Sequence, residues 1–215
     1  MGHGSVRRGR AAVASASLPA MGVTACTGGS GDRATGDDGR ARAASSCANG
    51  EYAWSGARHR TQLTALGEPV TFAKGTDSYE TRLEPLDTET VHRPTVTGAP
   101  RGVAPARVIK ALGAHLKVAE PLAGPDEEEV PEEIVFGRHA GELEGAYYLW
   151  RQIGFVDADF AYTCGDAEPV RGHVRTWETV GQGFLACAVS SDGAAGRVAA
   201  ETSCPAGSRA AAEEV

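Results

Sequence analysis

The stretch Val156-Asp157-Ala158-Asp159-Phe160-Ala161-Tyr162-Thr163-Cys164 decides the fold, because its apolar side chains recur at every second position. A period of two sustained over this length is typical of a β-strand with one buried face. The turn signal Gly165-Asp166 follows, and residues 170–180 then predict the next strand. Consecutive strands with short breaks between them favour an antiparallel sheet.

Working outward from this stretch, the sequence predicts more strands and one helix. Further strands are expected at residues 52–66 (one long strand or two short ones), 70–73, 79–86 and 184–189. Residues 104–117 predict the helix, because Pro105 suits a first helical position and Val108, Ile109, Leu112 and Leu116 recur at helical spacing. We therefore expect an α+β fold, mainly antiparallel β-sheet with one helix.

Between the helix and the deciding stretch, residues 121–144 predict a long loop. Gly124-Pro125 and Pro131 interrupt any regular element there. The acidic run Asp126-Glu127-Glu128-Glu129 is expected to be a solvated face of that loop.

The first 25 residues have the order of an export signal. Arg7, Arg8 and Arg10 precede an uncharged, moderately apolar stretch from residue 11 to residue 25. That stretch is too short for a permanent membrane span. Arg7-Arg8 would allow a twin-arginine route, but the general secretory route fits the neighbouring residues better.

The segment Val23-Thr24-Ala25-Cys26 resembles the lipobox of bacterial lipoproteins, in which the cysteine is lipidated and becomes the new N-terminus. Ordinary signal peptidase cleavage is the alternative. The chain has five cysteines, and an odd one in an exported protein needs a fate. We therefore expect a lipoprotein signal peptide over residues 1–25 and lipid attachment at Cys26.

This anchor implies a modular order along the mature chain. Residues 26–46 carry no large apolar side chain and predict a flexible tether after the lipidated cysteine. Residues 47–206 are expected to form a single β-rich, disulfide-bonded domain, and residues 207–215 a disordered tail. The protein would then sit on the outer face of the cytoplasmic membrane.

The four remaining cysteines, Cys47, Cys164, Cys187 and Cys204, allow three pairings. We expect Cys47–Cys164 and Cys187–Cys204, because the second pair closes a short loop, whose cross-linking stabilises by about 3 kcal/mol. No Cys-x-x-Cys spacing is present, so the sequence indicates neither a zinc site nor a redox site.

The charge and the motif content narrow the classes of function. The net charge is −7, and the +3 of the leader leaves −10 for the rest, which argues against nucleic-acid binding. No nucleophile elbow, zinc-protease motif, phosphate loop or dinucleotide fingerprint occurs. We therefore expect no cofactor and no metal, and we nominate no catalytic residue.

Five residues are candidates for ligand binding. The rings of Trp54 and Trp150 could stack on sugars, although a chain with only 6% aromatic residues is expected to need them in its core. Arg171, His173 and Arg175 share one face of a predicted strand. They could bind a carboxylate or phosphate, but pairing with acids across the sheet is favoured.

Several motifs together resemble a known class. The lipobox, Cys47-Ala48-Asn49-Gly50-Glu51-Tyr52, Tyr162-Thr163-Cys164-Gly165-Asp166, Arg175-Thr176-Trp177 and Cys187 are similar to those of small uncharacterised lipoproteins of actinobacteria. That class carries no known activity, so the resemblance implies location rather than chemistry.

We therefore expect a non-catalytic module that binds cell-wall glycan, an envelope protein or a small ligand. The alternatives are an extracytoplasmic hydrolase acting on wall or polymer, and an inhibitor-type lipoprotein that blocks a protein partner.

Overall fold

A computed structural model describes residues 49–191 and 193–212. The expected signal peptide, Cys26, the expected tether and Cys47 lie outside the described residues, so the predictions made for them stay predictions. The described residues belong to one compact unit, Ala43–Val215.

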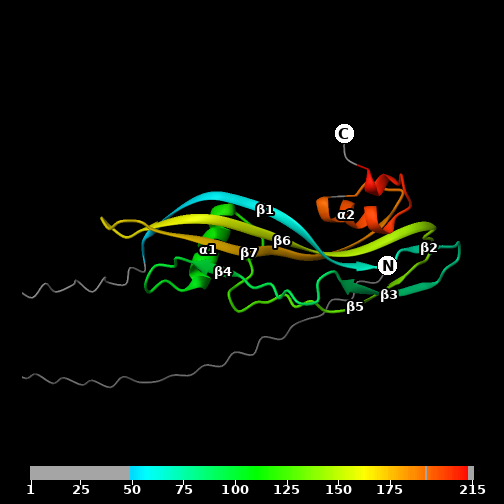
Figure 1. Ribbon diagram of the computed structural model, residues 1–215, viewed down its shortest axis with the longest axis horizontal. Coiled ribbons are helices and arrows are strands. Elements are labelled where there is room, and N and C mark those ends of the chain that lie inside the picture. The colour runs from blue at the N-terminus through cyan, green and yellow to red at the C-terminus, as the bar shows by residue number, and fades with distance from the viewer. Residues whose placement is uncertain (1–48, 192, 213–215) are drawn as a thin grey trace, which may run out of the picture. The chain divides into compact units, whose positions relative to one another are not determined.

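Three long antiparallel strands form the centre of the fold: β1 (Glu51–Gly67), β6 (Gly145–Thr163) and β7 (Val170–Ala186). They lie side by side in the order β1-β6-β7 (Figure 1). Tyr162 of β6 pairs with Tyr52 on one side and with Val170 on the other. The predicted antiparallel sheet is confirmed.

Four shorter strands extend this sheet, all by antiparallel pairing. β3 (Ser78–Pro85) pairs with the end of β1, and β5 (Ile134–His139) pairs with β3. β2 (Val70–Phe72) pairs with the start of β6, and β4 (Thr95–Thr97) pairs with β7.

Both helices pack on the same face of β6. α1 (Pro105–Leu116) contacts Val156, Ala158, Phe160 and Tyr162 in one core cluster, and α2 (Ala194–Ser203) contacts Tyr148 and Trp150 in another. All these β6 residues have even numbers, and alternation along a strand puts even positions on one face. We call this the helix face and the opposite side, with the odd-numbered residues, the loop face.

The close contact of α2 with the sheet depends on small residues. A Cβ on Gly183 of β7 or on Gly196 of α2 would clash with the ring of Trp150, so both positions need glycine. Ala199 and Ala200 are fully buried beside them. Small side chains thus let the helix reach the ring of Trp150, which is only 7% exposed.

The structure differs from the sequence-based expectations in several elements. β6 begins eleven residues before Val156, β7 runs through the expected break at residues 181–183, and β5 lies inside the expected loop. α2 was not predicted. The tail expected to be disordered from residue 207 contains a 3-10 turn, Arg209–Ala211, in which Ala210 is fully buried.

The C-terminal disulfide is confirmed: Cys187 and Cys204 are joined, with their Cα atoms 5.6 Å apart. It ties the end of α2 to the residue that follows β7. Cys164 is disulfide-bonded as well, but Cys47 lies outside the described residues, so the Cys47–Cys164 pairing stays a prediction. No helix in residues 49–191 and 193–212 has both the length and the apolar character to cross a membrane.

Candidate functional site

The two tryptophans proposed as sugar platforms belong to packed clusters. Trp150 is buried, and its indole N–H donates to the side-chain oxygen of Gln152 at 3.1 Å. Trp54 is half-buried, with its ring stacked on Tyr52 at 5.3 Å and on His115 of α1 at 6.1 Å between centres. Both rings therefore contribute first to the core, as the low aromatic content favours.

The basic face of β7 pairs with acids across the sheet. Arg175 Nε donates to Asp157 at 2.8 Å, and His173 Nδ1 lies 2.8 Å from Asp159. His173 Nε2 is also 3.4 Å from Asp157. Of the two alternatives for this face, internal pairing is the one the geometry fits. Arg171 lies opposite Ala161 and is exposed.

Asp157 is the buried member of this cluster, at 9% exposure. Desolvation by burial pushes the pKa of its carboxyl up, but the hydrogen bond and charge of Arg175, together with those of His173, outweigh it and hold the pKa below its ordinary value. The carboxylate is therefore charged and fully engaged by its neighbours, which leaves little capacity for an incoming ligand.

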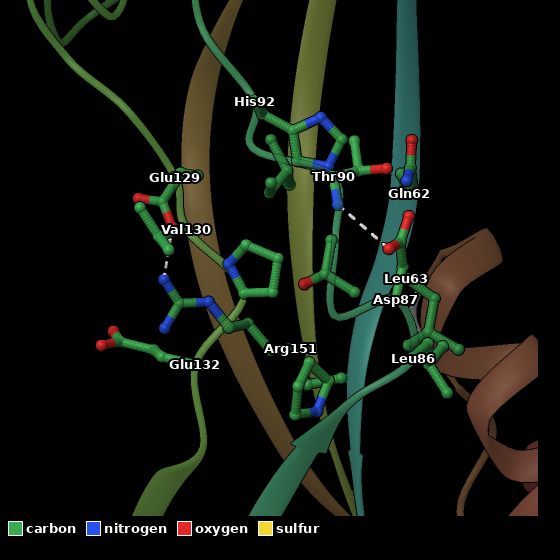
Figure 2. Close-up of a pocket in the computed structure, with 15 residues that line it drawn as sticks. Gln62, Leu63, Leu86, Asp87, Thr90, His92, Glu129, Val130, Glu132 and Arg151 are labelled. Atoms are coloured by element: carbon green, nitrogen blue, oxygen red, sulfur yellow. Dashed lines mark hydrogen bonds and ion pairs between the residues drawn. The ribbon is translucent and has the colours of Figure 1, made fainter.

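A different part of the loop face contains a pocket, which we call the loop cleft. It lies between residues 85–92 and residues 129–132, over residues 62–65 of β1 and Arg151 and Ile153 of β6. Figure 2 shows His92 and Thr90 at one end, Glu129 and Val130 on one side, and Leu86 and Asp87 on the other.

The two loops are joined where the cleft begins. His92 and Glu129 exchange two backbone hydrogen bonds, of 2.9 and 3.0 Å. The His92 ring packs edge-on against Phe155, with 5.1 Å between ring centres. Further along, Ala123 donates its N–H to the carbonyl of Trp177 and accepts from the hydroxyl of Thr176. The loops are thus held to the sheet by backbone bonds, which pre-forms the cleft.

A turn shapes the other wall. One carboxylate oxygen of Asp87 accepts the backbone N–H groups of Glu89 and Thr90 at 2.8 and 3.0 Å. Figure 2 shows the bond from Thr90. Hydrogen bonding from the Thr90 side chain and from these two backbone groups lowers the pKa of Asp87. Such a local side-chain turn fixes the loop without help from the rest of the chain.

The floor of the cleft is polar. Arg151 Nη2 donates to Glu129 Oε2 at 2.6 Å, and both side chains are largely covered, at 18% and 23% exposure (Figure 2). Thr64 also lines the cleft, and its buried hydroxyl has no hydrogen-bond partner among the described residues. An unpaired buried hydroxyl costs free energy unless a ligand or water satisfies it.

The rim of the cleft is apolar. Leu86 is 55% exposed on one loop and Val130 is 48% exposed on the other, and each is among the large apolar side chains most open to solvent. An apolar rim around a few convergent polar groups is the usual composition of a ligand site.

The size of the cleft limits what it can hold. Its volume of about 50 Å³ has room for a group of one or two water-sized units, whereas whole small-molecule sites occupy roughly 300–1,000 Å³. The cleft is therefore suited to one projecting group of a larger molecule.

Sequence reasoning missed the cleft, and one signal in the sequence was misjudged. Glu129 belongs to the acidic run that was expected to be solvated, yet it is half-buried against Arg151.

Residues 49–191 and 193–212 hold no group of three or more His, Cys, Asp or Glu side chains placed to bind a metal ion. Comparisons with protein-family models, with curated proteins and with solved structures return no match for this chain.

Proposed function

We propose that the chain is an exported, lipid-anchored binding module, and that its loop cleft takes one projecting group of a larger envelope molecule. The observation that carries the binding role is the pre-formed cleft, in which the exposed side chains of Leu86 and Val130 flank the Arg151–Glu129 pair. The anchor and the location rest on the leader and on Val23-Thr24-Ala25-Cys26.

A polymer or a protein suits such a cleft better than a free small molecule. A volume of about 50 Å³ encloses too little of a free molecule to hold it tightly. A branch of a cell-wall glycan or a side chain of an envelope protein would fill the cleft, while the rest of the ligand would gain contacts with the exposed rim. The apolar rim side chains would then supply most of the binding free energy.

The test measures retention on purified cell wall. The oxidised mature domain is incubated with the wall, and both pelleted protein and released soluble fragments are quantified. Leu86→Glu and Val130→Glu should lower the affinity at least about tenfold, because each puts a charge into an apolar contact. Val170→Glu is the matched control: Val170 is 43% exposed at the start of β7, away from the cleft lining.

Each outcome discriminates between the functions. Retention that Leu86→Glu reduces and Val170→Glu does not supports glycan binding through the cleft. Release of soluble fragments contradicts the binding-only function and favours the hydrolase. If neither retention nor release is observed, a protein ligand remains as the candidate. It would then be sought by crosslinking in cells. Equal loss in both variants contradicts the assignment of the cleft.

The anchor is tested separately, by the intact mass of protein extracted from membranes. A mass that matches cleavage before Cys26 plus lipid supports the lipoprotein assignment, and Cys26→Ser should then release the protein from the membrane. A mass that retains the leader contradicts it.

A further inference from the structure

Strand β1 has a long open edge. On one side it pairs with β6 from Glu51 to Leu66, but on the other it pairs with β3 only over Ala65–Gly67. Along residues 51–64 no other strand among the described residues pairs with it, and Figure 1 shows β1 as the outer strand there.

The regular part of this edge begins after an irregularity. The register with β6 shifts between Ser55 and Arg58, where Gly56 adopts a left-handed conformation with φ +61°. From Arg58 to Leu63 the register with β6 is then unbroken. We call residues 58–63 the open edge of β1.

An open edge carries backbone donors and acceptors ready for another strand. On a regular strand, alternate residues direct their N–H and C=O groups away from the paired neighbour, so the open edge offers about three such residues. Extended peptides add to edges of this kind through main-chain hydrogen bonds, and side chains on alternate positions provide specificity.

The charge on the open edge indicates what would add to it. Arg58, His59 and Arg60 are consecutive and exposed on a chain whose net charge is −7. Arg58 makes no ion pair within the described residues, although Asp157 lies opposite it in the register, because Asp157 is engaged by Arg175.

The two neighbouring basic residues are partly engaged. The Arg60 guanidinium lies 4.9 Å from the centre of the Phe155 ring and donates to Gln62. His59 contacts Glu178 at 3.2 Å. Of the three, Arg58 is therefore the residue with the most capacity for an incoming acid.

Two kinds of strand that could add to the open edge would interact differently with its basic residues. A second copy of the chain would bring the same basic residues to its own open edge, so that two like-charged edges face each other. An acidic extended segment would instead place carboxylates beside Arg58 and Arg60, which share a face because they are two residues apart.

We propose that the open edge of β1 is a strand-addition site for an extended acidic segment of a partner protein. This site adjoins the proposed glycan contact. Gln62 and Leu63 of the open edge also line the loop cleft, whereas its basic residues Arg58, His59 and Arg60 do not.

The test uses three synthetic eight-residue peptides with the oxidised mature domain. One alternates glutamate with valine, the second alternates lysine with valine, and the third is the glutamate peptide with every backbone nitrogen methylated. Amide hydrogen exchange of residues 58–63 and fluorescence anisotropy report binding. The glutamate peptide alone should slow exchange at alternate amides of the open edge.

Variants locate the charge contribution. Arg58→Glu should weaken binding of the glutamate peptide at least about tenfold, because attraction becomes repulsion. Arg171→Glu, the matched control on the same sheet face, should leave binding within about twofold, since Arg171 lies on β7 away from the open edge. Arg58→Gln is the milder replacement if the glutamate variant folds poorly.

Four results would overturn the proposal. If amide exchange at residues 58–63 is unchanged with millimolar glutamate peptide, the open edge is not a peptide-binding site. Equal protection by the lysine peptide removes the charge argument. Equal binding of the methylated peptide removes strand addition, because methylation deletes the backbone donors. Protection that grows with protein concentration in the absence of peptide identifies a second copy as the occupant.

Discussion

The loop face has two halves that are built from the same strands, β6 and β7, and that differ in what lies over them. Around Asp157 and Asp159 the face is open, and its charges pair with His173 and Arg175 of the neighbouring strand. Around Ile153 two loops cover it, and Ile153 is only 2% exposed.

This difference shows that a charged strand face is not by itself a binding site. In the open half, residues opposite each other neutralise one another, because cross-strand neighbours are the nearest partners available. In the covered half, the partner of Arg151 comes from a loop, and a hollow remains between loop and sheet. The ligand site that we propose therefore lies where the loops cover the sheet incompletely.

The largest effect expected from this comparison is on stability. Ile153→Ala should lower the free energy of unfolding by about 2–4 kcal/mol, because it leaves a cavity under the loops. Arg171→Ala in the open half should change it by less than about 0.5 kcal/mol. Urea unfolding measures both, and a small loss for Ile153→Ala would mean that the covered half is loosely packed.

An intermediate effect is expected at the buried acid of the open half. Asp157→Asn should cost about 1–2 kcal/mol at neutral pH, because charge-assisted hydrogen bonds are lost. Asp159→Asn should cost less, since the Asp159 side chain is 57% exposed.

The same carboxyl predicts a pH dependence. Because folding lowers the pKa of Asp157, its contribution is fully present above the ordinary value of 3.8 and is lost as the pH falls through the lower folded pKa. Unfolding titrations from pH 6 downward should therefore show a smaller acid loss for Asp157→Asn than for the unmodified protein. Parallel curves would contradict the assignment.

The smallest effect concerns the two ion pairs of the long loop. A double-mutant cycle on Arg151 and Glu129 should give a coupling of about 1 kcal/mol, because both side chains are largely covered. The same cycle on Arg93 and Glu128, which are 59% and 48% exposed, should give a coupling within the error of the measurement. Equal couplings would mean that the loop does not shield the cleft floor.

The sequence predicted the elements whose pattern reflects one buried face. The second half of β6 alternates because its even positions meet α1 and its odd positions meet solvent or pair with β7. α1 was predicted from Pro105 and from apolar residues at helical spacing. The Cys187–Cys204 pairing was also predicted, because closing a short loop is a local property.

Elements that are buried on both sides were harder to predict. The first half of β6 is a nearly continuous apolar run. Tyr148 and Trp150 pack against α2, while Leu149 and Ile153 are buried on the loop face. Such a run has no period of two to detect. α2 was missed because it buries only alanines and glycine, which carry a weak pattern.

By itself, the sequence determined an antiparallel sheet with a helix on it, one local disulfide, and an export signal as an expectation. Only the tertiary structure decided where a ligand could enter and which edge stays open. The physical reason is that the loop cleft combines four separated segments, and that the open edge of β1 depends on which strands do not pair with it. Neither property is encoded in any local period of side chains.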